Sequence, residues 1–542
     1  MQKIKNQKVN FINLLKKTNN EIKKNKYNKK INKKKIEYKN LFLKKPEYLF
    51  NIVDELISKK QKEKQEIFLY KKLEKIIEEN QTIFSNLIPY FFKNLNKRTT
   101  NGDIGKNFFL IVHKISKKLK EFKESISKLE FFLNMEIKSE IKKINKNLLL
   151  IKNINSKINN IKNESNSTIF YEKDTIKNLI TNRQILTNQL NKIAGIKSLE
   201  EKNNFFLFLN KKNILLKNSK KTDIFPTNGL YVSNNISIGC QFYKKKTMKI
   251  LDPIITTGTL SAILKFKNKQ LELTKNKIGQ LIYNFSSIFN TINQLGYDID
   301  CKPGKRIFSR LHPKIIPNKN NKSKIKLFPK WNVLNISNPK NYEIKFLGNN
   351  KWKIKNLFND KEFINFKVEK KKDSSSLLKF DGIVIKYLNK FLNQNDKYLI
   401  ESTATVIDQF SISSNITEKT KIAFFETNNK DLDDYSNFKK MIDLENYKLI
   451  NNKETIEESY ENYKNKIKKK IEELKLNQKL KVKKEKMLLE KNKYELNNNF
   501  SLQNLNKEKI NLEKSNLSNY KSYLQPSINE MNEIIKIFNS DI

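Results

Sequence analysis

One stretch decides the fold, and it runs from Phe108 to Lys162: FFLIVHKISKKLKEFKESISKLEFFLNMEIKSEIKKINKNLLLIKNINSKINNIK. Apolar residues recur there every three or four positions, which places them on one face of a continuous α-helix. These seam residues are Ile115, Leu119, Phe122, Ile126, Leu129, Leu133, Ile137, Ile141, Ile144, Leu148, Ile151, Ile154, Ile158 and Ile161. A helix of this length would span roughly 80 Å. A globular core rarely needs such a helix, whereas a coiled coil or an elongated bundle does.

Further helices are predicted on both sides of this stretch. Upstream, helical periodicity begins near Tyr48, and we expect Pro89 to close or kink that helix. Downstream, a second helix is predicted from about Asp174, which can act as its N-cap, to Gly195, which is placed to stop it. A third is predicted from Leu260 to Leu295. The sequence is therefore dominated by long helices.

Helices return beyond Glu454, and the last of them begins at about Phe500. This last helix carries an apolar seam that ends close to the end of the sequence: Leu517, Tyr520, Leu524, Ile528, Met531, Ile535 and Phe538. Such a seam suggests self-assembly through a coiled coil. Packing within one chain would explain the seam equally well.

Two regions between the helices have the alternation of β-strands. Residues 201–257 contain short β-type runs separated by Asn, Lys and Gly turns. Residues 317–415 are mostly strand-like, and Tyr342–Phe346 alternates strictly between apolar and polar side chains. The turn Gly348-Asn349-Asn350 follows and leads into Trp352, so a β-hairpin is predicted there.

The predicted fold class is α+β: a long α-helical coiled coil or bundle formed by the N- and C-terminal parts, with an inserted β domain. In chain order, we expect a basic N-terminal arm, a long-helix region, a β-hairpin region, a long helix with a loop, the inserted β domain, returning helices and a C-terminal coiled-coil helix. Their expected bounds are 1–47, 48–200, 201–257, 258–316, 317–415, 416–499 and 500–542.

The net charge is large, and we attribute it to base composition. The 542 residues include 109 Lys and Arg against 56 Asp and Glu, for a net charge of +53. Only Arg98, Arg183, Arg306 and Arg310 are arginines, and Lys, Asn and Ile, whose codons are A/T-rich, dominate the chain. Specific base recognition prefers the bidentate arginine side chain. A lysine-rich coiled-coil protein that binds nucleic acid non-specifically is the alternative hypothesis, but its lysines should cluster on one face, and here they are spread along the sequence.

The sequence contains no Walker loop, no GxGxxG, no HExxH and no GxSxG motif. Cys240 and Cys301 are the only cysteines and His113 and His312 the only histidines, so few base–nucleophile or metal-ligand constellations can form. We expect no enzyme activity, no cofactor and no metal site. No apolar run approaches the length of a membrane-spanning helix, and the first 30 residues lack the apolar core of a signal peptide.

The segment Thr257–Lys267, TGTLSAILKFK, resembles a segment of the flagellar hook-associated protein 1 family, the first hook–filament junction proteins. That family has Gly-x-Leu, then Leu-x-Phe-Arg, then a long helix that ends in a Phe-Asn pair and a glycine-containing loop. The matching residues here are Gly258, Leu260, Leu264, Phe266, Phe289, Asn290 and Gly296. Lys267 stands where the family has arginine. Tyr342 to Trp352 is similar to a hairpin of the family's inserted β domain.

The order of these matches holds from about Tyr48 to the C-terminus. The N-terminus departs from the family's Asn-Asn signature, of which Thr18-Asn19-Asn20 is the main trace, and Pro526 interrupts the terminal seam. Both departures fall in the parts that polymerise in this family.

The resemblance implies a structural component of the bacterial flagellum that is exported unfolded through the flagellar type III apparatus and forms the junction between hook and filament. Its implied partners are further copies of itself in a helical ring, the hook protein, the next junction protein or filament cap, and a flagellar export chaperone. Neither a nucleic-acid partner nor membrane insertion is expected.

Overall fold

The computed structural model describes residues 47–95, 105–164, 169–201, 204–209, 213–229, 231, 236–241, 248–323, 325, 327–337, 339–364, 368–370, 375–388, 392–427 and 435–498. The chain divides into two compact units, one of Ile57–Leu480 and one of Met1–Leu56 with Lys481–Ile542. The sections below describe the unit Ile57–Leu480 and the helices that begin or end in it. Nearly all of the predicted basic arm and all of the predicted C-terminal seam lie outside the described residues.

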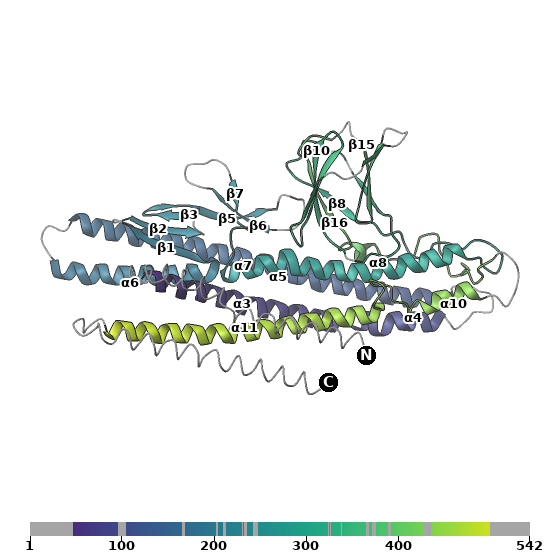
Figure 1. Cartoon of the computed structure of the whole chain (residues 1–542), viewed down its shortest axis with the longest axis horizontal. Coiled ribbons are helices and arrows are strands. Elements are labelled where there is room, and N and C mark those ends of the chain that lie inside the picture. Colours follow the sequence, from purple (N-terminus) through teal and green to yellow (C-terminus); the bar gives the residue numbers. More distant parts are fainter. Residues whose placement is uncertain are drawn as a thin grey trace, which may run out of the picture. The chain divides into compact units, whose positions relative to one another are not determined.

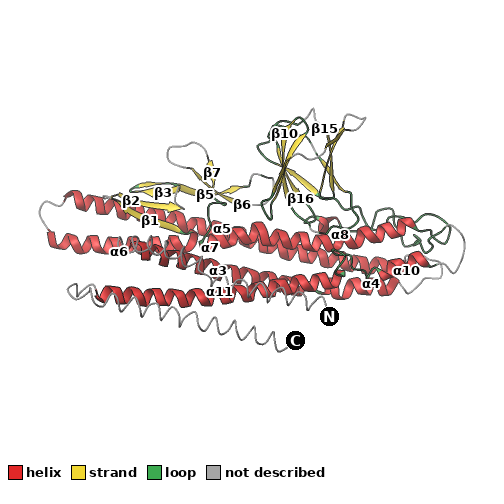
Figure 2. Cartoon of the chain, in the orientation of Figure 1, coloured by secondary structure: helices red, strands yellow, loops and turns green. Residues whose placement is uncertain are grey.

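Long helices form the body of this unit (Figures 1 and 2). They include α3 (Glu47–Glu79), the 60-residue α5 (Gly105–Glu164) and α6 (Ile169–Ala194). The apolar seam predicted for α5 is confirmed, because all its members except Ile154 and Ile161 are buried. The other face of α5 is largely lysine, glutamate and asparagine. One apolar stripe is therefore enough to hold this long helix in the bundle.

Two helix boundaries differ from those predicted. The prediction that Pro89 closes or kinks the first helix is wrong: α3 ends at Glu79, a π-helical turn η1 follows (Ile83–Leu87), and Pro89 lies in the first turn of α4 (Ile88–Leu95). The helical turns run on from η1 into α4 without a break, so the missing amide of Pro89 falls directly after the wider π-helical turn. The second helix begins at Ile169, before Asp174, and it ends as predicted at Gly195, whose φ is +66°.

The predicted third helix is interrupted near its start. It consists of α7 (Gly258–Lys265), the π-helical turn η2 (Phe266–Leu271) and α8 (Glu272–Leu295). The apolar periodicity does not change at η2, which is why the sequence predicted one uninterrupted helix. Such π-helical turns are often found at functional sites.

Two small antiparallel sheets follow α6. The first has the strand order β1 (Ile196–Glu201), β2 (Asn204–Leu209), β3 (Asn213–Lys217), β4 (Lys220–Lys221). The second has the order β5 (Asp223–Asn228), β6 (Ile236–Gln241), β7 (Met248–Ile250). The side chain of Asn145 on α5 fixes the second sheet, because it accepts from the amide of Ile224 at 3.2 Å and donates to its carbonyl at 2.5 Å.

The inserted β domain consists of two further sheets around a core of its own. One has the order β12 (Glu362–Ile364), β11 (Lys351–Asn356), β10 (Tyr342–Gly348), β16 (Lys397–Glu401), β8 (Lys314–Pro317). The other has the order β13 (Val368–Lys370), β14 (Ser375–Phe380), β15 (Ile383–Leu388), β9 (Phe328–Trp331). The separate core includes Trp352, Ile344, Leu378, Ile385, Tyr398 and Ile400. Figure 1 shows both sheets standing on the side of the bundle that carries α8.

The hairpin predicted at Tyr342 is confirmed. In it, β10 and β11 are antiparallel, with Ile344 opposite Ile354 and Phe346 opposite Trp352. Asn349 and Asn350, at φ +49° and +59°, form the two-residue turn. Positive φ at both central positions is what this hairpin turn requires, and asparagine tolerates it better than most residues.

Three helices complete the described chain: α9 (Val406–Gln409), α10 (Ser436–Asp443) and α11 (Ile456–Asn498). α11 packs against α3, since the Tyr460 hydroxyl donates to the carbonyl of Ile77 at 2.5 Å. Nearby, Lys468 Nζ lies 2.8 Å from Glu78 Oε1. Among the described residues, none of the helices is both long and apolar enough to cross a membrane.

Candidate functional site

The motif singled out in the sequence begins where α6 ends against α7. Gly258, the first residue of α7, has φ +81°, and a Cβ on it would lie 2.3 Å from the carbonyl oxygen of Ile193. Gly195 faces the same crossing, and a Cβ on it would lie 1.9 Å from Thr257 Oγ1. Only glycine combines positive φ with so close an approach of two backbones. The two glycines therefore fix how the end of α6 packs against the start of α7.

The apolar motif residues that follow are core residues. Leu260 is fully buried, and Leu264 and Phe266 are nearly so. The Phe266 ring meets Tyr70 of α3 edge to face, with 5.3 Å between ring centroids. Phe266 is the first residue of η2. The motif thus marks the place where α3 contacts the π-helical turn.

Lys267, which replaces the family's arginine, is only 2% exposed. Its Nζ donates to Asn134 Oδ1 on α5 at 2.7 Å and to the carbonyl oxygen of Ile236 on β6 at 3.2 Å. Burial lowers the pKa of this amine to about 8, and Glu130 and Asp252 oppose that shift. Lys267 therefore ties α5 and β6 to η2, at the cost of burying a charge.

A polar network next to η2 joins three helices. The hydroxyl of Tyr70 on α3 donates to Gln270 Oε1 at 3.2 Å, and Gln270 Nε2 donates to the hydroxyl of Tyr463 on α11 at 3.1 Å. Tyr463 also lies 2.7 Å from Thr274 Oγ1 on α8. Burial, with a smaller contribution from Glu66, raises the pKa of Tyr70 to about 12. Polar contacts between helices favour one axial register over its neighbours, so this network fixes α3 and α11 relative to α8.

Phe289, near the end of α8, belongs to a buried aromatic cluster. Its ring centroid lies 5.5 Å from that of Phe91 on α4 and 5.4 Å from that of Phe308 in the following loop. Phe308 in turn stacks on Phe410, at 5.3 Å. Residues from four separate segments meet here, and of these four the motif identified in the sequence includes only Phe289.

Asn290 clamps the loop that carries Phe308. Its Oδ1 accepts from the amides of Ile307 and Phe308 at 3.0 and 2.8 Å, and its Nδ2 donates to the carbonyl of Phe308 at 3.1 Å. Asn293 acts in the same way, accepting from the amide of Ala423 at 3.0 Å and donating to the carbonyl of Lys305 at 2.6 Å. Asn290 and Asn293 thereby satisfy backbone amides and carbonyls of the loop segments that cross α8, which would otherwise need partners elsewhere.

Gly296 ends α8 next to the side chain of Asn437 on α10. A Cβ on Gly296 would lie 2.1 Å from Asn437 Nδ2, and that same nitrogen donates to the carbonyl of Ala423 at 2.7 Å. The glycine therefore leaves room for α10 to approach the end of α8. Its φ of −97° is ordinary, so close approach and not backbone strain selects glycine here.

The motif residues thus form two groups that the structure keeps apart. Gly258, Leu260, Leu264 and Phe266 lie on α7 and η2, where α3, α5 and α6 meet. Phe289, Asn290 and Gly296 lie at the C-terminal end of α8. Both groups are structural. The predicted assembly seam at Leu517, Tyr520, Leu524, Ile528, Met531, Ile535 and Phe538 lies outside the described residues.

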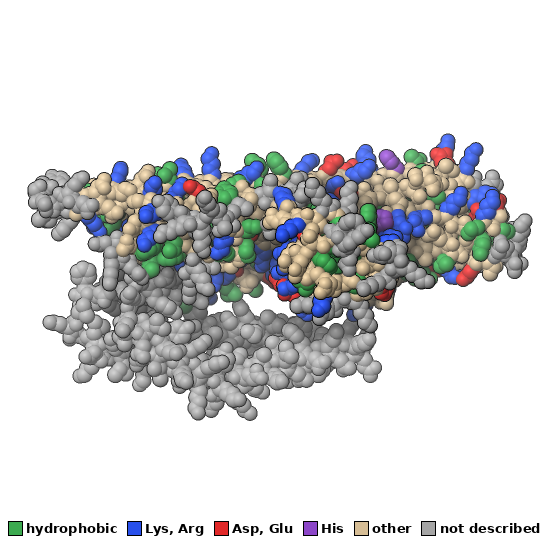
Figure 3. All heavy atoms as spheres, turned by 90° about the horizontal axis from the view of Figure 1, so that it is seen from above, with side chains coloured by type: hydrophobic (Ala, Val, Ile, Leu, Met, Phe, Trp, Pro, Cys, Tyr) green, Lys and Arg blue, Asp and Glu red, His purple; other side chains and the backbone are tan. Residues whose placement is uncertain are grey.

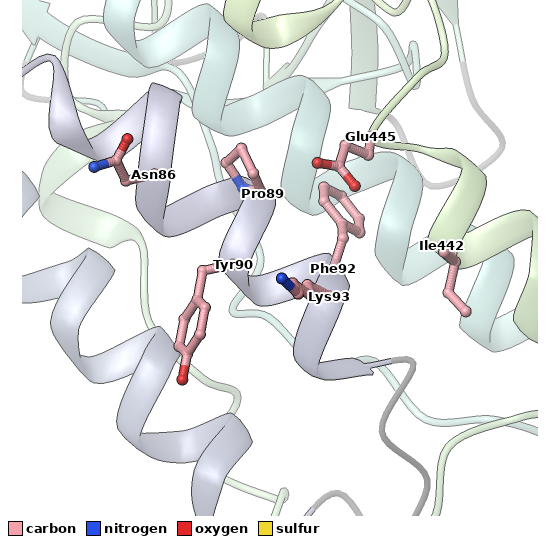
Figure 4. Close-up of a pocket in the computed structure, with 7 residues that line it drawn as sticks. All are labelled: Asn86, Pro89, Tyr90, Phe92, Lys93, Ile442 and Glu445. Atoms are coloured by element: carbon pink, nitrogen blue, oxygen red, sulfur yellow. The ribbon is translucent and has the colours of Figure 1, made fainter.

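A shallow pocket lies between α4 and α10 (Figure 4), with a volume of about 470 Å³. In Figure 4 the Glu445 carboxylate lies beside Phe92, whereas Tyr90 points away from it. Burial, and to a lesser extent Glu457, raises the pKa of Glu445. Among the described residues that line it, Glu445 and Lys93 are the only carboxylate and amine, and none is a cysteine, a histidine or a serine. Within the described part of the chain, no cluster of three or more metal-ligating side chains exists.

Residues 70–308 match the model of the flagellar hook-associated protein FlgK helical domain. The chain is 29% identical over 427 residues to flagellar hook-associated protein 1 of Buchnera aphidicola subsp. Schizaphis graminum, an alignment that covers 74% of this chain and 72% of that protein. It is 22% identical over 400 residues to flagellar hook-associated protein 1 of Salmonella typhimurium, with 72% of this chain and 70% of that protein covered.

Among solved structures, the chain resembles the flagellar hook junction protein FlgK from Burkholderia pseudomallei, with a TM-score of 0.68 and 14% sequence identity. That likeness covers 82% of this chain and 99% of the other. It confirms the α+β fold predicted from the sequence.

Proposed function

The chain is a relative of flagellar hook-associated protein 1, and from this premise we propose that it is a structural component of the bacterial flagellum that forms the junction between hook and filament. The observation that carries this proposal is the match to the Buchnera protein across 427 residues, which is not limited to one domain. No constellation of catalytic side chains in the described residues calls for an enzyme instead.

The charge of the described surface supports the structural role over nucleic-acid binding. Figure 3 shows lysine and arginine side chains scattered over the described part of the face that it draws, with acidic side chains between them. Many lysines are also paired, for example Lys123 with Asp408 and Lys353 with Glu362, at 2.7 and 2.6 Å. A nucleic-acid interface would need lysines gathered into one stripe.

The specific partners follow from this role. We infer that copies of this chain associate in a ring at the end of the hook, contacting the hook protein on one side and the next junction protein or the filament cap on the other. An export chaperone would keep the chain competent for type III secretion. The apolar stripe from Leu517 to Phe538 supports self-association. Burying one leucine of such a stripe contributes about 1.5–3 kcal/mol.

The domain plan supports the same role. We propose that residues 1–47 and 500–542 supply a coiled-coil domain and that the long helices of residues 48–316 belong to a separate helical domain. We place the inserted β unit between Lys314 and Glu401, because these residues face each other across β8 and β16. Val406 and Phe410 pack in the core shared with the helices, which supports an end of this unit before Asn415, the last residue predicted for it.

Copurification tests the proposal. Hook–basal-body particles would be isolated from the cells that make this protein and probed for it by quantitative mass spectrometry. We expect the protein to stay with the particles through density-gradient centrifugation, in a constant ratio to hook protein. If the protein remained in the soluble fraction while hook protein sedimented, the junction role would be untenable.

A further inference from the structure

The inserted β domain meets α8 through a row of buried polar side chains. Asn276, Gln280, Tyr283 and Asn284 follow one another at helical spacing, so they share one face of α8. Each is at most 5% exposed. We call these four residues the mount. Besides bonds within α8, such as that of Asn276 to the carbonyl of Glu272, these residues bond to the segments where the chain enters or leaves the sheets of the insert.

The exit of the insert is held by Asn276. Its Oδ1 accepts from the amide of Thr403 at 3.0 Å, and Thr403 Oγ1 donates to the Asn276 carbonyl at 2.6 Å. Thr403 follows β16 directly, after only Ser402. The last strand of the insert is therefore bonded to α8 within two residues of its end.

The connection between β9 and β10 is held by the rest of the mount. Asn284 accepts from the amide of Ile336 at 2.8 Å, and Gln280 Nε2 donates to the carbonyls of Ile336 and Ser337 at 2.7 and 2.6 Å. The Tyr283 hydroxyl donates to the carbonyl of Val333 at 2.7 Å. The two sheets of the insert are thereby attached through the segment that joins them.

Gly279 explains how α8 comes close enough for these bonds. A Cβ on Gly279 would lie 1.8 Å from the carbonyl oxygen of Thr403. Glycine in the middle of a helix is less stable than alanine by about 1 kcal/mol. The close backbone contact with Thr403 accounts for its presence at this position.

We propose that the mount makes the inserted β domain a rigid arm, held at one fixed angle to the helical bundle, and that it does not swing on its connecting segments. Four bonded points along α8 oppose rotation about any single one of them. Within the insert, a core of its own that includes Trp352 and Ile344 holds the two sheets together, so the insert itself does not deform. The arm and the bundle therefore move as one body. A neighbouring subunit would meet the arm at the same angle in every copy of the chain.

Distance measurements between paired spin labels test this proposal. Labels would be attached to cysteines at Lys351, on the exposed tip of the insert, and at Lys128, on the exposed face of α5, after Cys240→Ala and Cys301→Ser. We expect one narrow distance distribution for the parent. The double change Asn276→Leu and Asn284→Leu should broaden it roughly twofold or more, because the arm can then sample several angles.

Two further variants keep the result decisive. Thr291→Ala removes a hydrogen bond that α8 makes only to itself, through Ser287, and should leave the distribution narrow. Gly279→Ala keeps all four side chains of the mount but pushes Thr403 away from α8. It should therefore shift or broaden the distance distribution, and it tests the proposal even if the double variant fails to fold. Tryptophan emission would show that the insert is still folded, since Trp352 is fully buried in it. A broad distribution in the parent, or an unchanged narrow one in Gly279→Ala, would overturn the proposal.

Discussion

At the scale of single residues, the crossing of α6 and α7 depends on two glycines. Gly258 has a positive φ and almost no free space around its Cα, whereas Gly348 also has a positive φ but only Gln394 Cγ near a built Cβ, at 3.9 Å. The pair separates backbone strain from steric exclusion. Strain alone in this region costs a non-glycine residue about 1–2 kcal/mol.

We predict that Gly258→Ala lowers the free energy of unfolding by about 2–4 kcal/mol, because strain and a clash with Ile193 add. Gly348→Ala, the matched control, should cost only about 1–2 kcal/mol. Urea unfolding followed by far-ultraviolet circular dichroism measures both. Equal losses for the two variants would show that the crossing is looser than described.

Lys267 gives the chain a predictable pH dependence. Burial lowers its pKa from 10.5 to about 8, so between these values the unfolded chain binds more protons than the folded one at this position. The contribution of Lys267 to stability must therefore rise as the pH increases from about 8 to 10.5, by at most about 3 kcal/mol.

Comparing the parent with Lys267→Met isolates this contribution, since all other groups titrate in both proteins. We subtract the unfolding free energy of the parent from that of Lys267→Met. This value should be highest near pH 7 and should fall above about pH 8, because the parent gains stability as its buried amine loses its charge. Urea midpoints measured at a series of pH values give the result. A difference that stayed constant across the series would mean that Lys267 is solvated in the folded state.

At the scale of elements, periodic segments were predictable and interruptions were not. The seam of α5 and the alternation of Tyr342–Phe346 show which face of each segment is buried. Burial of apolar side chains is what mainly decides whether such a segment forms a helix or a strand. The turn η2 and the placement of Pro89 depend on how neighbouring helices cross, which no local pattern encodes. The hydrogen-bond partners of the α8 asparagines could not be predicted either, because they lie far away in the sequence, as Thr403 does from Asn276.

The terminal seam belongs to the same scale, and its role in assembly remains a prediction. Changing Leu524→Asp and Met531→Asp puts two carboxylates into one apolar stripe, and we expect the variant to be lost from hook–basal-body particles. Sedimentation of each variant with isolated particles is the measurement. Leu476→Asp with Leu480→Asp, on an exposed part of α11, is the control for added charge.

Pro526 lies inside this stripe and should cost about 3 kcal/mol within a helix. If it already breaks the seam, the double variant would sediment in the same amount as the parent. That outcome would remove assembly from the C-terminal stripe and assign it to another part of the chain.

At the scale of the whole molecule, the β insert should be separable from the helices. Lys314 and Glu401 are opposite each other in an antiparallel pair, so a short glycine–serine linker can replace residues 315–400. We predict that this deletion keeps the helical circular dichroism of the parent, with a lower melting temperature because Ile336 leaves the helical core.

A longer deletion, of residues 317–415, is the comparison. It also removes Val406 and Phe410 from the core of the helices, and losing a buried phenylalanine alone costs about 3–5 kcal/mol. The longer deletion should therefore be clearly less stable in urea than the shorter one. Equal stability of the two would place the boundary of the insert beyond Phe410.

In the proposed junction role, this chain is a structural subunit at the end of the flagellar hook. Gold-labelled antibodies against the β insert, applied to isolated hook–basal-body particles and viewed by electron microscopy, test it most directly. We expect label at the distal end of the hook, and no label on particles from cells in which the gene is deleted. Label confined to the basal body, or particles that remain unlabelled while the protein is present in the cells, would contradict it.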